Sequence, residues 1–515
     1  MPRPTRYITT PIYYVNDVPH IGHAYTTIAC DVWARFWRLD GAEVFFLTGT
    51  DEHGQKVAKA AEASGESPQA FTDRVSQTFR ELARSMNIAN DDFIRTTEPR
   101  HYRACEELWR RIHAAGDLYL GEYGGWYAVR DEAFYRESET TLGEDGVRRG
   151  PTGAPVEWVK EPSWFFRLSA WQERLLELYE RNPDFIQPTS RRNEVISFVR
   201  AGLEDLSVSR TSFAWGVPVP DSPGHVMYVW LDALTNYLTA AGFPDETHPR
   251  WRFWPADVHV VGKDILRFHA VYWPAFLMSA GLPPPKRVFA HGWWTVEGQK
   301  MSKSLGNVVD PREEIARVGL DPFRFFLLRE IPFGQDGDFT RRGLLKRLNV
   351  DLANEFGNLA QRTLGFVARN TGGVLPSPDV LSEDDRALLD AAAGLLPAMR
   401  IEIERFAFHA ALEGAWQVIR DANAYIDREK PWALRKEDPV RMGTVLWVLA
   451  ETLRRLAILL QPVMPDTMGR LLDQLGVGTE ARDFAALAHP LPGGRPLPQP
   501  EPLFRKVEET VGQGG

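Results

Sequence analysis

The chain has 515 residues, of which 44% are hydrophobic and 25% charged, so it is long enough to form several folded domains. Acidic residues outnumber Lys and Arg by 69 to 60, which excludes a uniformly basic nucleic-acid binder but allows a local basic face. The two cysteines, Cys30 and Cys105, exclude a disulfide framework and a four-cysteine zinc site, and their scarcity favours a reducing, cytoplasmic location.

The first part of the chain has the pattern of alternating strands and helices. Residues 6–11 and 42–49 have the short apolar runs of buried strands, and residues 22–39 repeat apolar side chains at helical spacing. A strand, a helix and a strand within about 40 residues predict a βαβ unit and a parallel sheet. Two further helices are expected at residues 68–86 and 101–115.

The composition changes between residues 116 and 224, which are rich in Gly, Trp, Tyr and Arg and predict an inserted α+β domain. Strand patterns return at residues 226–230, 259–261 and 287–291. Beyond residue 344 the spacing is helical, which predicts an antiparallel bundle. Its expected helices include residues 381–394, 411–426 and 445–460. No run of about 18 uncharged apolar residues occurs, so no membrane span is expected.

The string Pro19-His20-Ile21-Gly22-His23 falls in the turn between the first expected strand and the first helix. Parallel sheets bind ligands at this edge, and a helix N-terminus offers backbone N–H groups to a phosphate. Gly22 permits close backbone approach, while His20 and His23 can donate hydrogen bonds to oxygens that gain charge as a phosphoryl bond breaks. The string therefore predicts a nucleotide-phosphate site.

A second motif, Lys300-Met301-Ser302-Lys303-Ser304, places two lysines in a loop of small residues. Such a loop can close on a triphosphate and stabilise the pyrophosphate that leaves. Alone, Lys300 and Lys303 would fit a solvated basic loop better, but the histidine motif upstream favours the phosphate interpretation.

The two motifs, in this order and with a long insertion between them, resemble the signature sequences of class I aminoacyl-tRNA synthetases. Over nearly its whole length the chain resembles the methionyl-tRNA synthetase family, in a bacterial-type form without a zinc knuckle. The resemblance implies an α/β fold with a Rossmann-type parallel-sheet catalytic domain, an inserted α+β connective domain and a C-terminal α-helical bundle. It also implies activation of methionine with ATP to methionyl-adenylate and pyrophosphate, then transfer of the methionyl group to the 3′ end of tRNA(Met).

The expected domain boundaries follow from the patterns and the resemblance together. They are residues 1–115 and 225–295 for the two halves of the Rossmann catalytic domain, 116–224 for the inserted domain, 296–343 for the lysine loop and stem-contact region, 344–480 for the anticodon-binding domain and 481–515 for a tail. Some family members carry a further C-terminal domain that dimerises them. Because this chain stops after the bundle, we expect a monomer.

For methionine, the resemblance implies a pocket with aromatic walls and one carboxylate. The implied methionine-binding residues are Ile12, Tyr14, Asp51, Trp230, Ala233, Tyr237, Ile265 and His269. Asp51 would pair with the α-ammonium, and Tyr14 and His269 would donate weak hydrogen bonds to the sulfur. Aromatic walls suit a polarizable thioether, and Trp273 is a further candidate, although each aromatic residue taken alone would also suit a core.

For ATP, the resemblance implies contacts from Gly22, His23, Gly262, Asp264, His291 and Lys303. The implied catalytic residues are His20, His23, Lys300 and Lys303. Arg210 would neutralise pyrophosphate or else form a surface ion pair. The methionine carboxylate is itself the nucleophile, so no general base is expected, and Mg²⁺ is expected to arrive with ATP.

For tRNA(Met), including the initiator, Asn358, Arg362 and Trp432 match the positions at which the family reads the anticodon. Single-stranded bases are read by hydrogen bonds and aromatic stacking, which these side chains can supply. Trp432 would otherwise be a buried bundle residue. A basic group would track the tRNA backbone or form a solvated face; it comprises Arg341, Arg342, Lys346 and Arg347.

Many family members carry a cysteine zinc knuckle in the inserted domain, whereas residues 119–160 here contain no cysteine. We therefore expect no structural zinc and no other protein-held metal. The expected replacement is packing among Trp126, Tyr127, Phe134 and Tyr135.

Two alternatives stay open, a same-class ligase for an aliphatic amino acid and a catalytically silent RNA-binding paralogue. The short insertion argues against the first alternative, because those ligases carry a large editing insertion, and the intact motifs argue against the second.

Overall fold

The computed structural model describes residues 2–15, 19–302 and 305–508, and the chain divides into two units. The sheet unit consists of Thr5–Pro19 and Phe45–His291. The helical unit consists of Met1–Pro4, His20–Val44 and Gly292–Gly515. The helix that begins in the histidine motif therefore belongs to the same unit as the lysine motif, although almost 280 residues of sequence separate them.

A seven-stranded sheet forms the centre of the sheet unit, in the order β10-β15-β14-β1-β3-β2, with β4 paired to β3. Its strands are β1 (Thr5–Thr9), β2 (Tyr13–Tyr14), β3 (Glu43–Asp51), β4 (Asp92–Arg95), β10 (Ile186–Gln187), β14 (Val258–Gly262) and β15 (Val288–His291). The pairs β1–β14, β14–β15, β10–β15, β2–β3 and β3–β4 all run parallel. The expected parallel sheet is confirmed, and β3, β14 and β15 are buried along nearly their whole length, as their apolar runs predict.

The sheet unit also contains helices outside the inserted module. They are α2 (Gln55–Ala63), α3 (Pro68–Ser85), α4 (Pro99–Ala114), α7 (Val229–Ala240) and α8 (Trp273–Ser279). Ser67 caps α3 by accepting a hydrogen bond from the N–H of Ala70, and prolines occupy the first positions of α3 and α4. Helix α7 is buried along almost its entire length and packs against α4. The helices expected at residues 68–86 and 101–115 are confirmed as α3 and α4.

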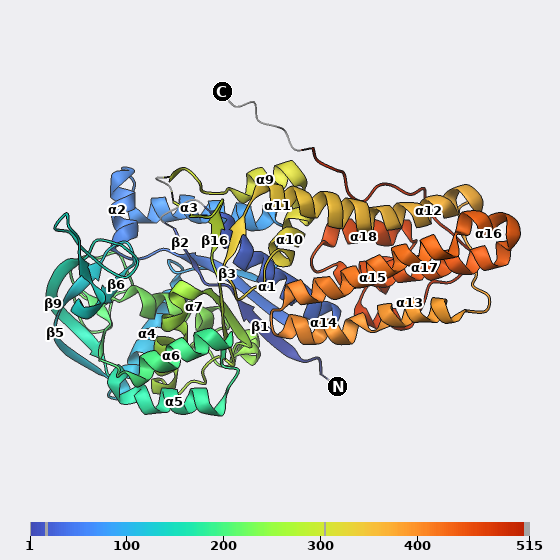
Figure 1. Cartoon of the computed structure of the whole chain (residues 1–515). Helices are drawn as coiled ribbons and strands as arrows, with labels where there is room; N and C mark the ends of the chain where they lie inside the picture. Colours follow the sequence, from blue (N-terminus) through green and yellow to red (C-terminus); the bar gives the residue numbers. More distant parts are fainter. Residues whose placement is uncertain (1, 16–18, 303–304, 509–515) are drawn as a thin grey trace, which may run out of the picture. The chain divides into compact units, whose positions relative to one another are not determined.

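An antiparallel sheet of order β11-β9-β5-β6 forms the inserted module, which Figure 1 shows around the long β5–β9 pair. Its elements are β5 (Leu118–Ala128), β6 (Ala133–Tyr135), β7 (Thr141–Leu142), β8 (Arg148–Arg149), β9 (Glu157–Phe166), α5 (Gln172–Arg181), α6 (Thr189–Arg200), β11 (Leu206–Ser207) and β12 (Ser209–Arg210). The expected aromatic packing is present, because Trp126 faces Tyr135 across β5 and β6, and the rings of Tyr127 and Phe134 are 4.7 Å apart. Strand β10 comes from the same stretch of sequence but pairs with β15 of the parallel sheet.

The prediction of a strand of the parallel sheet at residues 226–230 is wrong. Only β13 (Val226–Met227) is extended, and it pairs antiparallel with β12, outside the parallel sheet. The next residues turn into α7, so Trp230 lies in the first turn of a helix. A five-residue apolar run does not distinguish a buried strand from the start of a buried helix, which is why periodicity failed here.

The helical unit is built around α1 (Ile21–Leu39), which is buried on nearly all sides. Asp31 of α1 and Arg324 of α10 (Leu320–Arg329) form a fully buried ion pair, with 2.6 Å between Oδ2 and Nη2. The same guanidinium donates to the carbonyls of Pro462 and Val463, which follow α17 (Pro439–Leu460). Because every polar group of the pair is matched, this buried ion pair fixes α1 to α10 and to the far end of the bundle.

The remaining elements of the helical unit form a small sheet and a bundle. The sheet has the order β17-β16-β18 and consists of β16 (Trp294–Val296), β17 (Gln299–Lys300) and β18 (Gly337–Phe339). The other elements are α9 (Pro311–Val318), α11 (Arg341–Lys346), α12 (Asn358–Asn370), β19 (Val374–Leu375), α13 (Glu383–Ala393), α14 (Leu395–Glu404), α15 (Phe408–Glu429), α16 (Pro431–Glu437), α18 (Pro465–Gln474) and β20 (Arg495–Pro496). Figure 1 shows α12, α13, α15 and α17 running lengthwise beside one another, and the three expected helices are confirmed as α13, α15 and α17.

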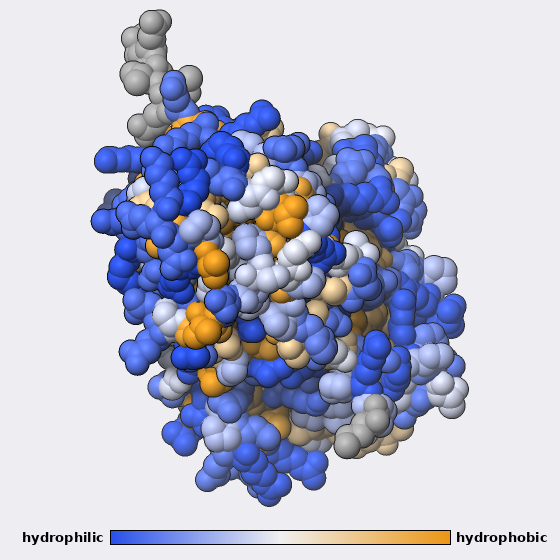
Figure 2. Space-filling model, turned by 90° about the vertical axis from the view of Figure 1, so that its right-hand side faces the viewer, coloured by the Kyte–Doolittle hydropathy of each residue, from blue (hydrophilic) through white to orange (hydrophobic). Residues whose placement is uncertain are grey.

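The face drawn in Figure 2 is mainly hydrophilic, with small separate hydrophobic spots. Among the residues that the structure describes, no helix combines the length and the apolar character that crossing a bilayer requires.

Candidate functional site

The histidine turn begins α1 with a reciprocal pair of hydrogen bonds. The N–H of Gly22 donates to Nδ1 of His20, and the N–H of His20 donates to Nδ1 of His23, each at 3.0 Å. Since both Nδ1 atoms accept, each ring carries a proton on Nε2. Burial and the neighbouring His20 lower the pKa of His23 well below its ordinary value, so His23 is neutral. A Cβ on Gly22 would lie 2.8 Å from Cε1 of His20, which explains the glycine.

The lysine motif lies in the same unit and is linked to the histidine turn. Lys300 ends β17, and its Nζ lies 5.5 Å from the ring centre of Trp293. Asn307 closes the following loop, because its Oδ1 accepts from the N–H of Ser302 and its Nδ2 donates to the carbonyl of Lys300. Just beyond, the carbonyl of Val309 accepts from the N–H of Ile21 in the histidine turn, at 3.1 Å.

Lys303, expected to contact phosphate, and Ser304 lie outside the described residues.

In the sheet unit, Asp51 lies at the carboxyl end of β3 and is only 6% exposed. Its Oδ1 has no hydrogen-bond partner among the described residues. Burial, followed by the charges of Asp232 and Glu132, raises the pKa of the Asp51 carboxyl well above its ordinary value. A buried carboxylate in this position is stabilised by a cation that brings its own N–H groups.

Tyr14 is the neighbour of Asp51 across the β2–β3 pair. Its hydroxyl lies 2.9 Å from Oε1 of Glu132 and 3.0 Å from the carbonyl oxygen of His53. A hydroxyl has a single proton, and the protein already offers it two acceptors. A hydrogen bond from Tyr14 to a thioether sulfur would have to replace these contacts, and it stays a prediction.

The aromatic residues expected at the amino-acid site come from α7 and from the turn of helix that precedes α8. Trp230 stacks on Phe268 with 3.9 Å between ring centres, and its ring also meets the edge of His269. The hydroxyl of Tyr237 lies 2.8 Å from Nε2 of His269, while Nδ1 of His269 lies 2.9 Å from the carbonyl of Ile265.

Burial lowers the pKa of His269 to about 4, so the ring is neutral at physiological pH. Its single N–H then points to the carbonyl of Ile265, and Nε2 accepts from Tyr237. The expected hydrogen bond from His269 to sulfur would need a different arrangement of these protons, and it stays a prediction. Trp273 is fully buried, and its indole N–H donates to Nε2 of His259, so it belongs to the core.

The remaining residues expected to bind methionine lie at the same core. Ala233 is buried in α7, one turn after Trp230. Ile12 and Ile265 are partly buried and pack against the hydrophobic cluster that contains Tyr237.

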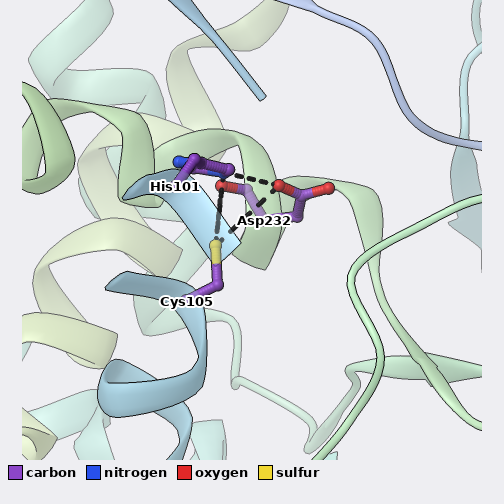
Figure 3. A group of neighbouring side chains, drawn as sticks. All are labelled: His101, Cys105 and Asp232. Carbon is purple, nitrogen blue, oxygen red and sulfur yellow. Dashed lines mark hydrogen bonds and ion pairs between the residues drawn. The ribbon is translucent and has the colours of Figure 1, made fainter. Parts of the chain in front are cut away.

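Two histidines hold Asp232 beneath this region. His53 Nδ1 lies 2.6 Å from Oδ2 of Asp232, and His101 Nε2 lies 2.7 Å from Oδ1. Burial raises the pKa of Asp232, but the charge and hydrogen bonds of the two histidines outweigh it and lower the pKa to about 2. Figure 3 shows His101 and Cys105, one turn apart on α4, converging on Asp232. These contacts fasten α4 to α7 and hold the charge of Asp232 near Asp51.

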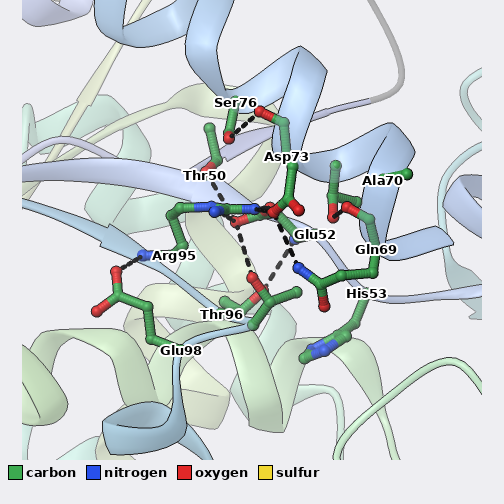
Figure 4. Close-up of polar contacts among 12 residues, drawn as sticks. Thr50, Glu52, His53, Gln69, Ala70, Asp73, Ser76, Arg95, Thr96 and Glu98 are labelled. Atoms are coloured by element: carbon green, nitrogen blue, oxygen red, sulfur yellow. Dashed lines mark hydrogen bonds and ion pairs between the residues drawn. The ribbon is translucent and has the colours of Figure 1, made fainter.

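Glu52, the next residue after Asp51, has a different environment. Arg95 binds it in a two-pronged contact, with 2.7 Å from Nη2 to Oε1 and 2.9 Å from Nε to Oε2. Arg95 also reaches Asp73 of α3, and Figure 4 shows this group with Thr50 and Thr96. The two adjacent carboxylates therefore differ, because Arg95 binds Glu52, whereas Oδ1 of Asp51 has no hydrogen-bond partner among the residues that the structure describes.

The residues expected to hold the nucleoside gather at the carboxyl ends of β14 and β15. Gly262 ends β14 opposite His291, which ends β15. A Cβ on Gly262 would lie 2.5 Å from Oδ1 of Asp264, so the carboxylate of Asp264 lies close to the backbone at the end of β14. Parallel sheets bind ligands at this edge.

Arg210 is neither exposed nor in a surface ion pair, since only 2% of it is exposed. Its guanidinium lies 4.2 Å from the ring of Phe134 and 4.6 Å from that of Tyr228, and Nε is 3.9 Å from Glu161. Arg210 therefore fastens the inserted module from within.

In the helical unit, two of the expected anticodon residues meet at the surface. The guanidinium of Arg362 lies 5.9 Å from the ring centre of Trp432 and 2.5 Å from Asp427. Trp432 is 47% exposed, which excludes the buried-core alternative. Asn358 is exposed one turn before Arg362 on α12.

Two members of the basic group are matched within the fold. Arg341 pairs with Glu314, and Arg347 pairs with both Glu330 and Asp351. Their charges are therefore largely neutralised within the fold.

Sequence reasoning missed Glu132, which reaches Tyr14 from the β5–β6 turn. Its neighbours in the sequence are charged and typical of an exposed hairpin, so no local signal marked it.

Comparison with known proteins gives consistent matches along the chain. The family model described as "tRNA synthetases class I (M)" matches residues 6–144 and 151–364, and the model described as "Anticodon binding domain of methionyl tRNA ligase" matches residues 375–513. A methionine–tRNA ligase of Brucella suis is 56% identical over 511 residues, covering 99% of both chains. The enzyme of that name from Mycobacterium leprae is 54% identical, covering 99% of this chain and 96% of the other.

Solved structures agree with these matches. A Mycobacterium tuberculosis methionyl-tRNA synthetase in complex with methionyl-adenylate is similar with a TM-score of 0.96 and 54% identity, covering 97% of this chain and 99% of that chain. The apo form from the same organism matches with a TM-score of 0.90 and 50% identity, covering 98% of this chain and 99% of that one.

Proposed function

Because this chain belongs to the methionyl class I tRNA synthetases, we propose that its sheet unit binds methionine and adenosine and that its helical unit supplies the phosphate-binding groups. The chain is a methionine–tRNA ligase, which activates methionine with ATP and transfers the methionyl group to tRNA. The assignment of these steps to particular residues is the proposal developed below.

The observation that carries the proposal is the buried Oδ1 of Asp51 at the carboxyl edge of the sheet, for which the described part of the chain offers no hydrogen-bond partner. The α-ammonium of methionine carries three N–H groups and a positive charge, and it matches this oxygen in both respects. Trp230 and Tyr237 present apolar rings for the thioether side chain, while Ile12, Ala233, Ile265 and His269 complete its surroundings. Selectivity then rests on shape and dispersion rather than on hydrogen bonds to sulfur.

In the reaction, a carboxylate oxygen of methionine attacks the α-phosphorus of ATP, and the bond from that phosphorus to the bridging oxygen breaks to release pyrophosphate. We assign the ribose to Asp264 and the adenine to the neighbourhood of Gly262 and His291. ATP enters as its Mg²⁺ complex, so the metal comes with the substrate. No residue needs to remove a proton, because the nucleophile is already ionised.

We assign the binding of the ATP phosphates to the histidine turn and the lysine motif. Both histidines accept backbone hydrogen bonds at Nδ1, so His20 and His23 present Nε2–H donors, and Gly22 leaves the helix N-terminus open to approach. Lys300 and Lys303 are assigned to the charge of the departing pyrophosphate. Preorganised donors stabilise charge that grows in the transition state without reorganising during the reaction.

For tRNA, Asn358, Arg362 and Trp432 are proposed to read the anticodon of tRNA(Met), the initiator included. The exposed ring of Trp432 beside the guanidinium of Arg362 supports this assignment, because a base can stack on one while the other binds its edge.

We further propose a cytoplasmic monomer that holds no structural zinc, with the domain division stated for the sequence. Both cysteines are buried and neither takes part in a disulfide within the described residues, which suits a reducing compartment.

The experiment is ATP–pyrophosphate exchange measured with each amino acid in turn. Exchange that depends on methionine alone is the expected result. Exchange with isoleucine or valine would assign the chain to an aliphatic amino acid, and no exchange with any amino acid would leave only RNA binding.

A further inference from the structure

Glu132 is a buried carboxylate in the turn between β5 and β6 of the inserted module, only 3% exposed. Its backbone adopts a left-handed conformation with φ of 48°, which is uncommon for a residue other than glycine, asparagine or aspartate. Such a conformation costs roughly 1–2 kcal/mol and persists only where the surroundings hold it. Strain of this kind, combined with burial of a charge, points to a role for the side chain.

The side chain of Glu132 reaches into the sheet unit's amino-acid site. Its Oε1 lies 2.9 Å from the hydroxyl of Tyr14 and 2.9 Å from the backbone nitrogen of Lys56. Its Oε2 accepts a hydrogen bond from Tyr127, and its carbonyl accepts one from Tyr228 at 3.0 Å. One residue of the inserted module thus contacts β2, the first turn of α2 and the residue that precedes α7.

The contact with Lys56 replaces a missing helix cap. Helix α2 begins after Gly54, which has no side chain to accept from the first N–H groups. Glu132 supplies the carboxylate acceptor that a capping residue normally provides. A Cβ on Gly54 would lie 2.6 Å from the Tyr14 hydroxyl and 2.7 Å from Oε1 of Glu132, so the glycine makes room for this contact.

The contact between Glu132 and Tyr14 determines which acceptor receives the hydrogen bond from the Tyr14 hydroxyl. Tyr14 can donate to the carbonyl of His53 or to the carboxylate of Glu132. Hydrogen bonds to ionised acceptors are about twice as strong as those to neutral ones, so Glu132 is the preferred acceptor. The ring of Tyr14 is thereby held beside Asp51.

We propose that Glu132 is a positioning residue for methionine, which orients Tyr14 and thereby makes the amino-acid site depend on the β5–β6 turn of the inserted module. The inference rests on the proposed function in one respect, the assignment of Tyr14 to the methionine site. It goes beyond that function by giving the inserted module a share in amino-acid binding.

The test is a double-mutant cycle of Glu132→Gln and Tyr14→Phe, followed by pyrophosphate exchange with methionine and ATP varied separately. Each single variant is expected to raise the KM for methionine about tenfold, as loss of one charge-assisted hydrogen bond does, with the KM for ATP changed less than twofold. The double variant is expected to equal the single variants within twofold, because both abolish the same charge-assisted hydrogen bond. Asp131→Asn is the matched control, since this neighbouring carboxylate bonds Tyr135 and Thr152 of the module instead, and it should leave both constants unchanged.

Glu132→Asp separates positioning from folding. Aspartate is better tolerated in the left-handed region but is one methylene too short to reach Tyr14. Because the shorter side chain also loses its contacts with Lys56 and Tyr127, we expect a folded variant with an unfolding midpoint below that of the wild type, a raised KM for methionine and an unchanged KM for ATP. The unfolding midpoint and the KM values of Glu132→Asp therefore test the proposal even if Glu132→Gln does not fold.

Two sets of results overturn the inference. Additive effects of Glu132→Gln and Tyr14→Phe, or an unchanged KM for methionine in Glu132→Asp, would show that Glu132 does not act through Tyr14. If Tyr14→Phe alone leaves the KM for methionine unchanged, the proposed role of Tyr14 fails first. If Tyr14→Phe raises that KM and neither Glu132 variant does, only the inference about Glu132 fails.

Discussion

Replacing Asp51 by asparagine should stabilise the free protein while it weakens methionine binding. The substitution keeps the shape of the side chain and removes a buried charge whose Oδ1 has no partner among the described residues. Desolvation of an unmatched buried group costs about 1–3 kcal/mol, so the free energy of unfolding should rise by about that amount at neutral pH. Removing one member of a buried charge pair costs about 3–5 kcal/mol, so kcat/KM for methionine should fall between about 10² and 10⁴-fold.

The pH dependence of the free energy of unfolding tests whether the charge of Asp51 destabilises the free protein. The pKa of Asp51 is raised in the folded state by burial and by the charges of Asp232 and Glu132. Its contribution to stability is therefore complete below the unfolded pKa and is lost as the pH rises through the folded pKa. Urea unfolding of the unliganded wild type and of Asp51→Asn should converge in acid and diverge toward neutral pH.

Glu52→Gln is the matched control, because it removes the adjacent carboxylate. Glu52 is bound by Arg95, so its loss should lower the free energy of unfolding by about 1.5–3 kcal/mol and leave the KM for methionine near the wild-type value. The reasoning is refuted if Asp51→Asn destabilises the free protein or changes kcat/KM for methionine less than threefold.

Three further predictions concern other parts of the molecule. Lys303→Ala should lower the adenylation rate about 10²–10³-fold, the loss typical of one transition-state donor, while methionine affinity, measured by equilibrium binding, stays within threefold; equal losses in both would contradict the phosphate role. Trp432→Ala should raise the KM for tRNA about 5- to 150-fold in aminoacylation, because one stacked base contributes about 1–3 kcal/mol, and a parallel fall in pyrophosphate exchange would argue for a structural role instead. His269 has a pKa lowered by burial from 6.5 to about 4, so its protonation should remove about 3 kcal/mol of unfolding free energy as the pH falls through this interval, and His269→Gln should flatten that part of the pH profile in urea unfolding. An identical pH profile in wild type and variant would show that a group other than His269 causes this loss of stability.

Much of the fold follows from local patterns in the sequence. The apolar runs of β3, β14 and β15 and the helical spacing of α13, α15 and α17 are long or regular enough to be unambiguous. The short apolar run at residues 226–230 is ambiguous, and its second half forms the start of α7.

The candidate site could be predicted in its residues but not in its hydrogen bonds. The family resemblance proposes Asp51, Tyr14 and His269 as site residues, yet the proton positions on Tyr14 and His269 depend on acceptors that the fold supplies. Glu132 is 118 residues from Tyr14 in the sequence, so no local pattern connects the two. The same holds for Asp31 and Arg324, whose buried ion pair spans 293 residues.

The reciprocal bonding of the histidine turn sets a requirement on replacement side chains. With the phosphate role proposed above, each position needs an acceptor for a backbone N–H and an outward hydrogen for the phosphate, and basicity is not needed at either. A carboxamide has both ends, whereas lysine lacks the acceptor and aspartate lacks the outward hydrogen. Asparagine is thus the side chain expected to replace histidine best at residues 20 and 23. A screen of all amino acids at these positions should retain the side chains that carry both an acceptor and a donor, whatever their charge.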